Sequence, residues 1–271
     1  ARAETLHCLH SILAASCTTS FELVVIDDAS PDAELVGDLK RLAGQGLFSL
    51  IVNPKNLGFV RTVNLGMALH PDRDVVLLNS DTQVFDGWLD RLHQAAYRHR
   101  RTATVTPLSN NATICSYPRF FQDNPFPLEL SYGELDILTA RVNAGFDVEA
   151  PTGVGFCMYI KRSALEDVGQ FNEAAFGRGY GEENDFCQRA IGQGWRNIIA
   201  ADVFVHHWGS ASFQGEKAKR VRSALKTLDK LHPNYQKDVA RFIERDPLSA
   251  ARCRLDNARL NRMSREKNVL I

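Results

Sequence analysis

The stretch "VVLLNSDTQVFDGW", from Val75 to Trp88, decides the fold because it joins an apolar run directly to a polar turn. A short apolar run bounded by polar residues is typical of a buried strand. The run stops at Asn79-Ser80-Asp81, which places one carboxylate at the end of that strand. Asp81 is a candidate metal ligand, although Ser-Asp-Thr is also an ordinary turn followed by a helix cap. Since a divalent cation takes several oxygen ligands, a site at Asp81 needs further ligands from elsewhere in the chain.

Comparable apolar runs recur along the first half of the chain and alternate with helical patterns. Strands are predicted at residues 22–27, 48–53, 75–79 and 103–108. Helices are predicted, from apolar residues at i, i+3 and i+4, at residues 32–43, 59–69 and 87–100. The strands are continuously apolar, which indicates cover on both faces and favours a parallel α/β sheet. Ligands of such sheets bind beyond the carboxyl ends of the strands, so the polar residues there are candidates for the site.

The two ends of the chain depart from this alternation. Residues 3–15 predict an amphipathic helix with no strand before it, so we expect the first strand of the sheet to be missing or supplied from outside. Near the other end, residues 217–231 and 237–245 predict charged helices, and the final "KNVLI" is either the first strand of a further domain or a tail. We predict a main domain over residues 1–215 and a helical C-terminal extension over residues 216–271, which could lead into a further domain.

The middle of the chain, residues 116–151, predicts a long excursion from the sheet. Regular structure is interrupted there by four prolines, Pro118, Pro125, Pro127 and Pro151. The chain is expected to return to a strand at residues 155–161. Long ordered loops in compact domains are usually functional or act as lids.

The composition of the 271 residues excludes several classes of protein. Lys+Arg and Asp+Glu are 32 each, so the formal net charge is zero and nothing indicates a nucleic-acid partner. The six cysteines are scattered without a CxxC pair, which predicts buried thiols in a reducing compartment. No apolar stretch approaches the roughly 18 residues of a membrane span, and the N-terminus lacks the pattern of a signal peptide. We therefore expect a cytoplasmic location.

Two further strand ends carry polar side chains. Asp27 and Asp28 follow the first predicted strand, where an acid can accept hydrogen bonds from a ribose or a base, although either could simply cap the helix near Asp32. After the second strand, Arg61 and Asn64 lie in the first turns of a helix. Arg61 suits a phosphate contact, but a single arginine on a solvated helix face is equally ordinary.

The second half of the chain adds an acid cluster and a histidine pair. Glu182, Glu183 and Asp185 open a helix after a glycine-rich loop, where the helix dipole alone favours acids. Crowding of these acids would raise the pKa of one of them, which suits a general base. His206 and His207 end a predicted strand and are candidate metal ligands, although most histidines are packing or surface residues.

Taken in order, six segments resemble the inverting family 2 glycosyltransferases of the GT-A fold, especially bacterial sugar transferases such as rhamnosyltransferases. The resemblance runs from about residue 3 to about residue 215. The segments are "ELVVIDDASPD", "NPKNLGFVRTVNLGM", "VVLLNSDTQVFDGWLDRL", "TGVGFCMYIKRSAL", "GYGEENDFCQRA" and "VFVHHWGSASF". The fold that it implies is an α/β GT-A fold, with a mixed, mostly parallel central sheet flanked by helices.

The resemblance also implies roles for individual residues in binding a donor. Asp28, with Asp27 beside it, would hold the base or ribose of a nucleotide-diphosphate sugar, and Arg61 and Asn64 would lie along the donor. Asn79, Ser80 and Asp81 stand at the DxD motif, with Asp81 binding Mg²⁺ or Mn²⁺. Asn79 replaces the first acid of that motif.

The remaining implied roles concern catalysis. His207 matches the late metal or diphosphate ligand, with His206 the second choice. Glu183, paired with Glu182, stands where the family's aspartate base deprotonates the acceptor hydroxyl. The implied donor is a UDP or dTDP sugar, and the implied acceptor is a glycan or a lipid-linked glycan, with at most peripheral membrane association, at the inner face of the membrane.

Two alternatives remain open. A Rossmann-like dehydrogenase or methyltransferase also has an acid after its second strand, but the chain contains no G-x-G-x-x-G run. The other alternative is a catalytically degenerate GT-A domain that acts as a scaffold or glycan-binding module.

Overall fold

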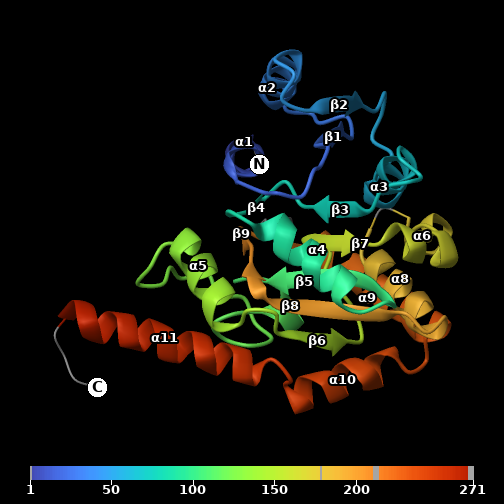
Figure 1. The fold of residues 1–271 in the computed structure, drawn as a ribbon. Coiled ribbons are helices and arrows are strands. Elements are labelled where there is room, and N and C mark those ends of the chain that lie inside the picture. The colour runs from blue at the N-terminus through green and yellow to red at the C-terminus, as the bar shows by residue number, and fades with distance from the viewer. Residues whose placement is uncertain (1, 178, 210–213, 268–271) are drawn as a thin grey trace.

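The computed structural model describes residues 2–177, 179–209 and 214–267, and a five-stranded sheet lies at its centre (Figure 1). The strands of this sheet, in spatial order, are β3 (Val75–Leu78), β7 (Cys157–Ile160), β5 (Thr102–Leu108), β8 (Arg196–Phe204) and β6 (Asp147–Ala150). Every residue of β5 and β7 is buried. Neighbouring residues of β7 belong to different apolar clusters, since Tyr159 packs in one and Met158 and Ile160 in the other. The sheet is therefore covered on both faces, as its continuous apolarity predicts.

The directions of the strands only partly follow the sequence pattern. The β5–β8 pair is parallel, whereas β3–β7, β5–β7 and β6–β8 are antiparallel. The sheet is mixed, as predicted, but its pairings are more antiparallel than the apolar runs indicated. The physical reason is that continuous apolarity reports burial on both faces and carries no information on strand direction. Strands β3, β5 and β8 still point the same way, so their carboxyl ends reach one side of the sheet.

Two small sheets accompany the central one. Strands β1 (Val24–Asp27) and β2 (Ser49–Val52) are parallel, and β4 (Thr82–Gln83) pairs antiparallel with β9 (His206–His207). Within the described residues, β1 pairs with β2 alone and β3 with β7 alone, so each has one edge without a strand partner. The strand expected ahead of the first helix stays a prediction.

Helices flank the sheets near the predicted positions. They are α1 (Arg2–Ala14), α2 (Ala33–Gly44), α3 (Phe59–Ala68), α4 (Trp88–Arg98), α6 (Arg162–Val168), α7 (Glu173–Phe176) and α8 (Glu182–Gly192). The side chain of Asp32 caps α2 by accepting hydrogen bonds from the amides of Glu34 and Leu35. Thus Asp32, and neither Asp27 nor Asp28, is the helix cap.

The proline-rich region contains more regular structure than expected. A short 3₁₀ turn (Thr113–Cys115) precedes the region, and helix α5 (Tyr132–Val142) and strand β6 lie inside it. Ser131 and Glu134 form a capping box at the start of α5, and this S-x-x-E pattern was a visible signal. The expectation of one long excursion over residues 116–151 was therefore wrong, because the prolines flank α5 and β6 and do not interrupt them.

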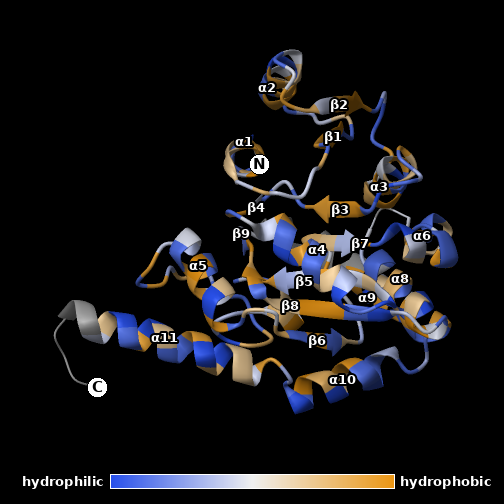
Figure 2. Ribbon diagram, viewed as in Figure 1, coloured by the Kyte–Doolittle hydropathy of each residue, from blue (hydrophilic) through white to orange (hydrophobic). Residues whose placement is uncertain are grey.

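The C-terminal extension is helical, as predicted, and packs on the central sheet. It consists of α9 (Gln214–Leu231), α10 (Tyr235–Arg245) and α11 (Ser249–Lys267), and α11 was not predicted as a separate helix. Figure 2 shows α11 largely in hydrophilic colours, yet its Leu255, and Leu248 directly before the helix, are fully buried in the cluster that covers one face of the sheet. The predicted strand in "KNVLI" falls mainly on residues 268–271, outside the described residues. No described helix combines the length and the apolarity that crossing a bilayer requires.

Candidate active site

Asp81 and His207 face each other beyond the end of β3. Thr82, directly after Asp81, pairs with His207 in the β4–β9 ladder, and the amide of Trp208 donates to the carbonyl of Asp81 at 3.0 Å. This pairing brings Asp81 Oδ1 to 3.3 Å from His207 Nε2. Asp81 therefore precedes a strand, and the alternative of an ordinary helix cap does not apply.

The other ring nitrogen of His207 is held by the backbone. His207 Nδ1 lies 2.8 Å from the carbonyl oxygen of Asn111, and a carbonyl can only accept. Nδ1 therefore carries hydrogen, and Nε2 faces the Asp81 carboxylate. A proton or a cation between Nε2 and Oδ1 would hold the two groups at this separation. Metal-binding histidines are commonly oriented in this way, so the pair fits a divalent cation.

His206 has a different environment. Its ring stacks on Tyr132 with centroids 3.9 Å apart and meets Trp208 edge-on at 4.5 Å. Burial lowers the pKa of His206 to about 4, and the nearby His207 adds to this effect. His206 is therefore part of an aromatic cluster, and the geometry favours His207 as the ligand.

The turn after β5 holds His207 in place, and sequence reasoning missed it. Asn110 accepts from the amide of His207 at 2.9 Å and donates from its side chain to the His207 carbonyl at 3.0 Å. Gly209 is needed beside this turn because its φ is +64° and an added Cβ would lie 1.9 Å from Asn111 Nδ2. The available signal was the amide pair Asn110-Asn111 directly after a strand end.

Asp81 and His207 are the two candidate metal ligands that the described residues bring together. Among residues 2–177, 179–209 and 214–267, no group of three His, Cys, Asp or Glu side chains is arranged to hold an ion. Asn79 anchors the turn through its backbone, since its amide donates to Phe156 and its carbonyl accepts from the Thr82 hydroxyl. Ser80 is exposed.

The predicted acid pair lies at the start of α8, where Glu182 is buried and Glu183 is half-buried with one carboxyl oxygen out of contact with solvent. Gly181 precedes the helix without a capping side chain, and Glu182 is only 5% exposed. A Cβ added to Gly155 would lie 3.8 Å from the Glu183 carboxyl carbon, so this carboxyl group packs against the backbone before β7. Within the described chain, one oxygen of each glutamate has no hydrogen-bond partner. Helix capping does not account for two incompletely bonded carboxyl groups.

Burial raises the pKa of both carboxyl groups. For Glu182 the rise is to about 8, with the charge of Glu183 as the second cause. For Glu183, burial outweighs the hydrogen bonds from nearby backbone amides. A carboxyl group with a raised pKa is suited to proton transfer near neutral pH.

Asp27 and Asp28 are bonded within the protein. Asp27 is buried and accepts from the amide of Ser30 at 2.9 Å. Asp28 Oδ1 accepts from the Leu57 amide at 2.8 Å, and Oδ2 accepts from the Gly58 amide at 2.9 Å. Burial alone would raise the pKa of Asp28, but the hydrogen bonds outweigh it and hold this pKa below its usual value. Asp28 therefore stabilises the turn before α3.

The two candidates on α3 differ in their surroundings. Both side-chain ends of Asn64 bind the backbone of Phe171, at 2.9 and 3.0 Å. The Arg61 side chain is 55% exposed and approaches Glu173 only at 4.0 Å. Asn64 thus joins α3 to the loop after α6, while Arg61 is open to a ligand.

A match to a known family covers most of these elements. The model for "Glycosyl transferase family 2" matches residues 2–169. The chain belongs to glycosyltransferase family 2. The matched region includes Asp28 and Asp81, whereas Glu183 and His207 lie beyond it. Membership of this family disfavours the dehydrogenase and methyltransferase alternatives.

Known proteins resemble this chain in sequence or in fold. A Drosophila melanogaster protein named "Putative polypeptide N-acetylgalactosaminyltransferase 13" is 28% identical over 165 residues, which are 56% of this family 2 chain and 29% of that protein. The crystal structure of GalNAc-T7 with UDP, GalNAc and Mn²⁺ matches with a TM-score of 0.59 and 14% identity, over 86% of this chain and 47% of that one.

The mannosyltransferase PcManGT from Pyrobaculum calidifontis, in complex with GDP-Man and Mn²⁺, matches with a TM-score of 0.60 and 17% identity. That match covers 95% of this chain and 70% of the mannosyltransferase. The family 2 chain spans less than a third of the Drosophila relative and about half of GalNAc-T7. These similarities confirm the predicted GT-A fold.

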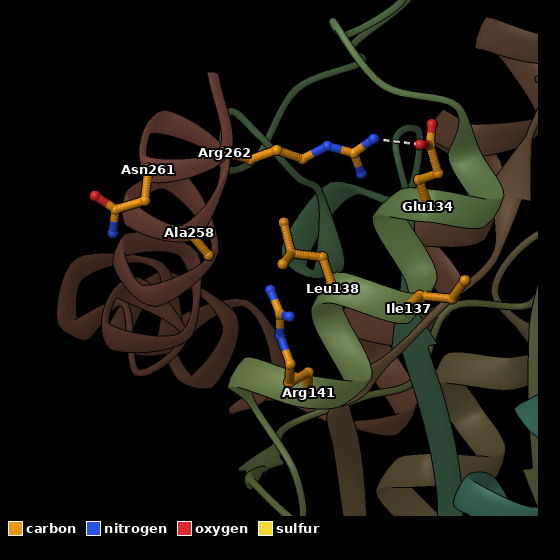
Figure 3. A pocket seen from close by; sticks show the side chains of 7 residues that line it. All are labelled: Glu134, Ile137, Leu138, Arg141, Ala258, Asn261 and Arg262. Atoms are coloured by element: carbon orange, nitrogen blue, oxygen red, sulfur yellow. Dashed lines mark hydrogen bonds and ion pairs between the residues drawn. The ribbon is translucent and has the colours of Figure 1, made fainter. Parts of the chain in front are cut away.

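Two cavities lie outside the Asp81–His207 pair. One of about 630 Å³ opens between α5 and α11 (Figure 3), with an ion pair between Arg262 and Glu134 at its rim. It is lined by Glu134, Ile137, Leu138, Arg141, Ala258, Asn261 and Arg262, none of which is a candidate site residue. A smaller one of about 160 Å³ includes Gly179 and Tyr180, in the loop that leads to the acid pair, and Ser223 of α9.

Proposed function

We propose that this family 2 chain is a metal-dependent inverting glycosyltransferase that moves a hexose from a nucleotide-diphosphate sugar to a hydroxyl group of an acceptor. The observation that carries the proposal is the 3.3 Å approach of Asp81 Oδ1 to His207 Nε2, with His207 Nδ1 bonded to a carbonyl. Mn²⁺ and a nucleotide are named in both solved structures of similar fold, which supports a cation at this place.

The chemistry follows from the acids and the pair of acceptors. Asp81 and His207 would hold Mg²⁺ or Mn²⁺, which supplies positive charge for the leaving diphosphate. Glu183 takes the proton of the acceptor hydroxyl while that oxygen forms a bond to the anomeric carbon. The bond from this carbon to the diphosphate oxygen breaks at the same time, and a single displacement of this kind inverts the configuration. Glu182, when protonated, adds no negative charge beside Glu183.

We propose a UDP or dTDP sugar as donor, with Asp27, Asp28, Arg61 and Asn64 along it and Asn79 and Ser80 near the diphosphate. The acceptor would be a glycan or a lipid-linked glycan in bacterial surface polysaccharide synthesis, as for a rhamnosyltransferase-like enzyme. The reaction would take place in the cytoplasm, at the inner face of the membrane, with which six free cysteines agree.

A second candidate is a degenerate domain that binds a glycan without turnover. The observations that favour it are Asn79 in place of an acid and the internal bonding of Asp28 and Asn64. Glu182 and Glu183 argue against it, because two carboxyl groups with raised pKa values are costly to retain without a use.

Donor binding gives the first test. Calorimetry with UDP, dTDP and GDP, and with their sugar forms, should show binding that depends on Mn²⁺. Asp81→Asn should weaken this binding by roughly 100-fold or more, because it removes a ligand of the cation. The control is Asp72→Asn, at an exposed aspartate before β3, which should bind as the wild type does. Unchanged donor binding in Asp81→Asn would exclude a metal at this position.

Turnover gives the second test. Glu183→Gln should retain donor binding and lose transfer by on the order of 100-fold or more, because an amide cannot accept the proton. Glu166→Gln, at an exposed glutamate on α6, is the matched control. Full turnover by Glu183→Gln would remove this residue from the role of base, and binding without turnover in the wild type would favour the degenerate domain.

A further inference from the structure

The turn between α9 and α10 reaches the helix that carries the acid pair. His232 follows the last residue of α9, and its Nε2 lies 2.8 Å from Asp185 Oδ1. A carboxylate can only accept, so His232 donates this hydrogen bond. The imidazole is mostly covered, with 16% of its side chain exposed. The C-terminal helices therefore contact α8 through a specific polar bond as well as through apolar packing.

Asp185 lies in the first turn of α8, two residues after Glu183. It is 1% exposed, and its amide donates to the carbonyl of Gly181 at 2.9 Å. Its second oxygen accepts from Arg189 Nε at 2.8 Å. Asp185 is thus the one acid of the cluster whose two oxygens both have partners in the protein. Because it shares a helical turn with Glu182 and Glu183, a shift of Asp185 would move both of them.

Arg189 extends the network towards the other side of the site. Its two terminal nitrogens donate to the carbonyl oxygens of Val168 and Gln170, at 2.5 and 2.8 Å. Gln170 in turn donates to the carbonyl of Asn64 on α3 at 2.9 Å. A continuous series of hydrogen bonds therefore runs from His232 through α8 to the helix that carries Arg61.

Packing fixes His232 at its end of this series. Its amide donates to the carbonyl of Leu228 at 2.7 Å, and its carbonyl accepts from the amide of Tyr235 at 3.0 Å. Leu228 and Tyr235 are both buried, in the same apolar cluster as Phe186 of α8. The backbone of His232 is therefore held on both sides, and its ring meets Asp185 from a fixed turn.

We infer that His232 is a positioning residue for the base, which sets the place of Glu183 by holding Asp185 at the start of α8. The inference rests on the proposed function, because it concerns the same site. On this inference, the C-terminal helices contribute to the transferase site by holding the start of α8. Since misplacement of a reacting group by about 1 Å can lower a rate by on the order of 100-fold, loss of this support should be measurable.

The test compares three variants at the histidine and one elsewhere. His232→Phe keeps a ring and removes the donor, His232→Gln keeps a donor, and His232→Asn shortens the reach. The control is His70→Phe, which removes a histidine that lies 3.0 Å from the carboxylate of Glu22 on the surface. We expect His232→Phe to lower kcat by roughly 10- to 100-fold, with the donor Kd within about twofold of wild type.

His232→Gln should recover most of the lost kcat, and His70→Phe should behave as the wild type. A kcat of His232→Phe within about twofold of wild type, or an equal loss in His232→Gln, would overturn the inference. If His232→Phe does not fold, His232→Asn takes its place with the same expectation.

A second readout separates this inference from the proposed function. If the wild type transfers no sugar, the proposed function fails by itself, and hydrogen exchange still measures positioning. His232→Phe should then speed exchange of the amides in residues 182–187 and 168–171, and leave β5 and β8 unchanged. Unchanged exchange in the first two segments would overturn the inference without any assay of activity.

Discussion

At the scale of single residues, acidic side chains that are neighbours in the sequence differ in their hydrogen bonding in the structure. Glu182, Glu183 and Asp185 form one acidic run, yet only Asp185 has partners in the protein for both oxygens. The partners of Asp185 are a residue one helical turn later and a residue 47 positions away. The second of these could not be predicted, because no local pattern reports a contact of that range.

Glu182 should make the stability of the fold depend on pH. Its pKa is raised to about 8 in the folded protein, so the unfolded chain releases this proton first as the pH rises. Because the folded protein must keep this carboxyl group protonated while the unfolded chain ionises freely, rising pH favours the unfolded chain. The free energy of unfolding should therefore decrease by a few kcal/mol between about pH 4.5 and about pH 8. Urea denaturation of wild type and Glu182→Gln measures the effect.

The variant lacks the titrating group, so its free energy of unfolding should change less over this range and exceed that of the wild type at the alkaline end. Glu166→Gln controls for the loss of one surface charge. Parallel pH profiles of wild type and Glu182→Gln would contradict a raised pKa at this position.

At the scale of elements, the sequence predicts well what is set by local pattern. Strands β1, β2, β3 and β5 and helices α1 to α4 lie within about two residues of the predictions, because their periods of apolarity are clear. Helix α5 was not predicted because the prolines on either side of it favour a loop, although the capping pattern of Ser131 and Glu134 indicates a helix start. The function of the turn after β5 was missed for another reason. Asn110 acts on His207, 97 residues later, and only the parallel β5–β8 pairing brings them together.

That turn should control the affinity for the cation. Asn110→Ala removes both hydrogen bonds that hold the backbone of His207, so Mn²⁺ affinity in the presence of nucleotide should fall by roughly 10- to 100-fold. Calorimetric titration measures it. Asn261→Ala, at an exposed asparagine on α11, is the control for a lost amide. Equal Mn²⁺ affinity in Asn110→Ala and wild type would show that the turn does not position the histidine.

At the scale of the whole molecule, the C-terminal helices share their core with the sheet. Leu248 and Leu255 pack in the same cluster as Val105 of β5 and Ile199 of β8. The sequence predicts an extension because charged residues dominate its helices. It does not indicate that the few apolar residues of these helices pack against the central sheet. The division at residue 215 stays a prediction, and the shared core makes one cooperative unit the expected behaviour.

Leu255→Ala tests this cooperativity. Leu255 is fully buried, so its truncation should destabilise the whole fold by about 2–5 kcal/mol in a single transition. Leu260→Ala on the same helix changes a side chain that is 45% exposed and should cost less than about 0.5 kcal/mol. A separate early transition in urea, followed by circular dichroism and tryptophan fluorescence, would mean that the extension unfolds by itself.

The open edges of β1 and β3 have a consequence for the behaviour of this polypeptide at high concentration. In the described part of the chain, each of these strands leaves a row of amide and carbonyl groups unpaired along one side. β3 consists of Val and Leu alone, so it has no lysine or proline that would repel an incoming strand. Such edges can pair with a strand of another molecule. We therefore expect reversible self-association that increases with protein concentration and is already present at the concentrations used for crystallisation or titration.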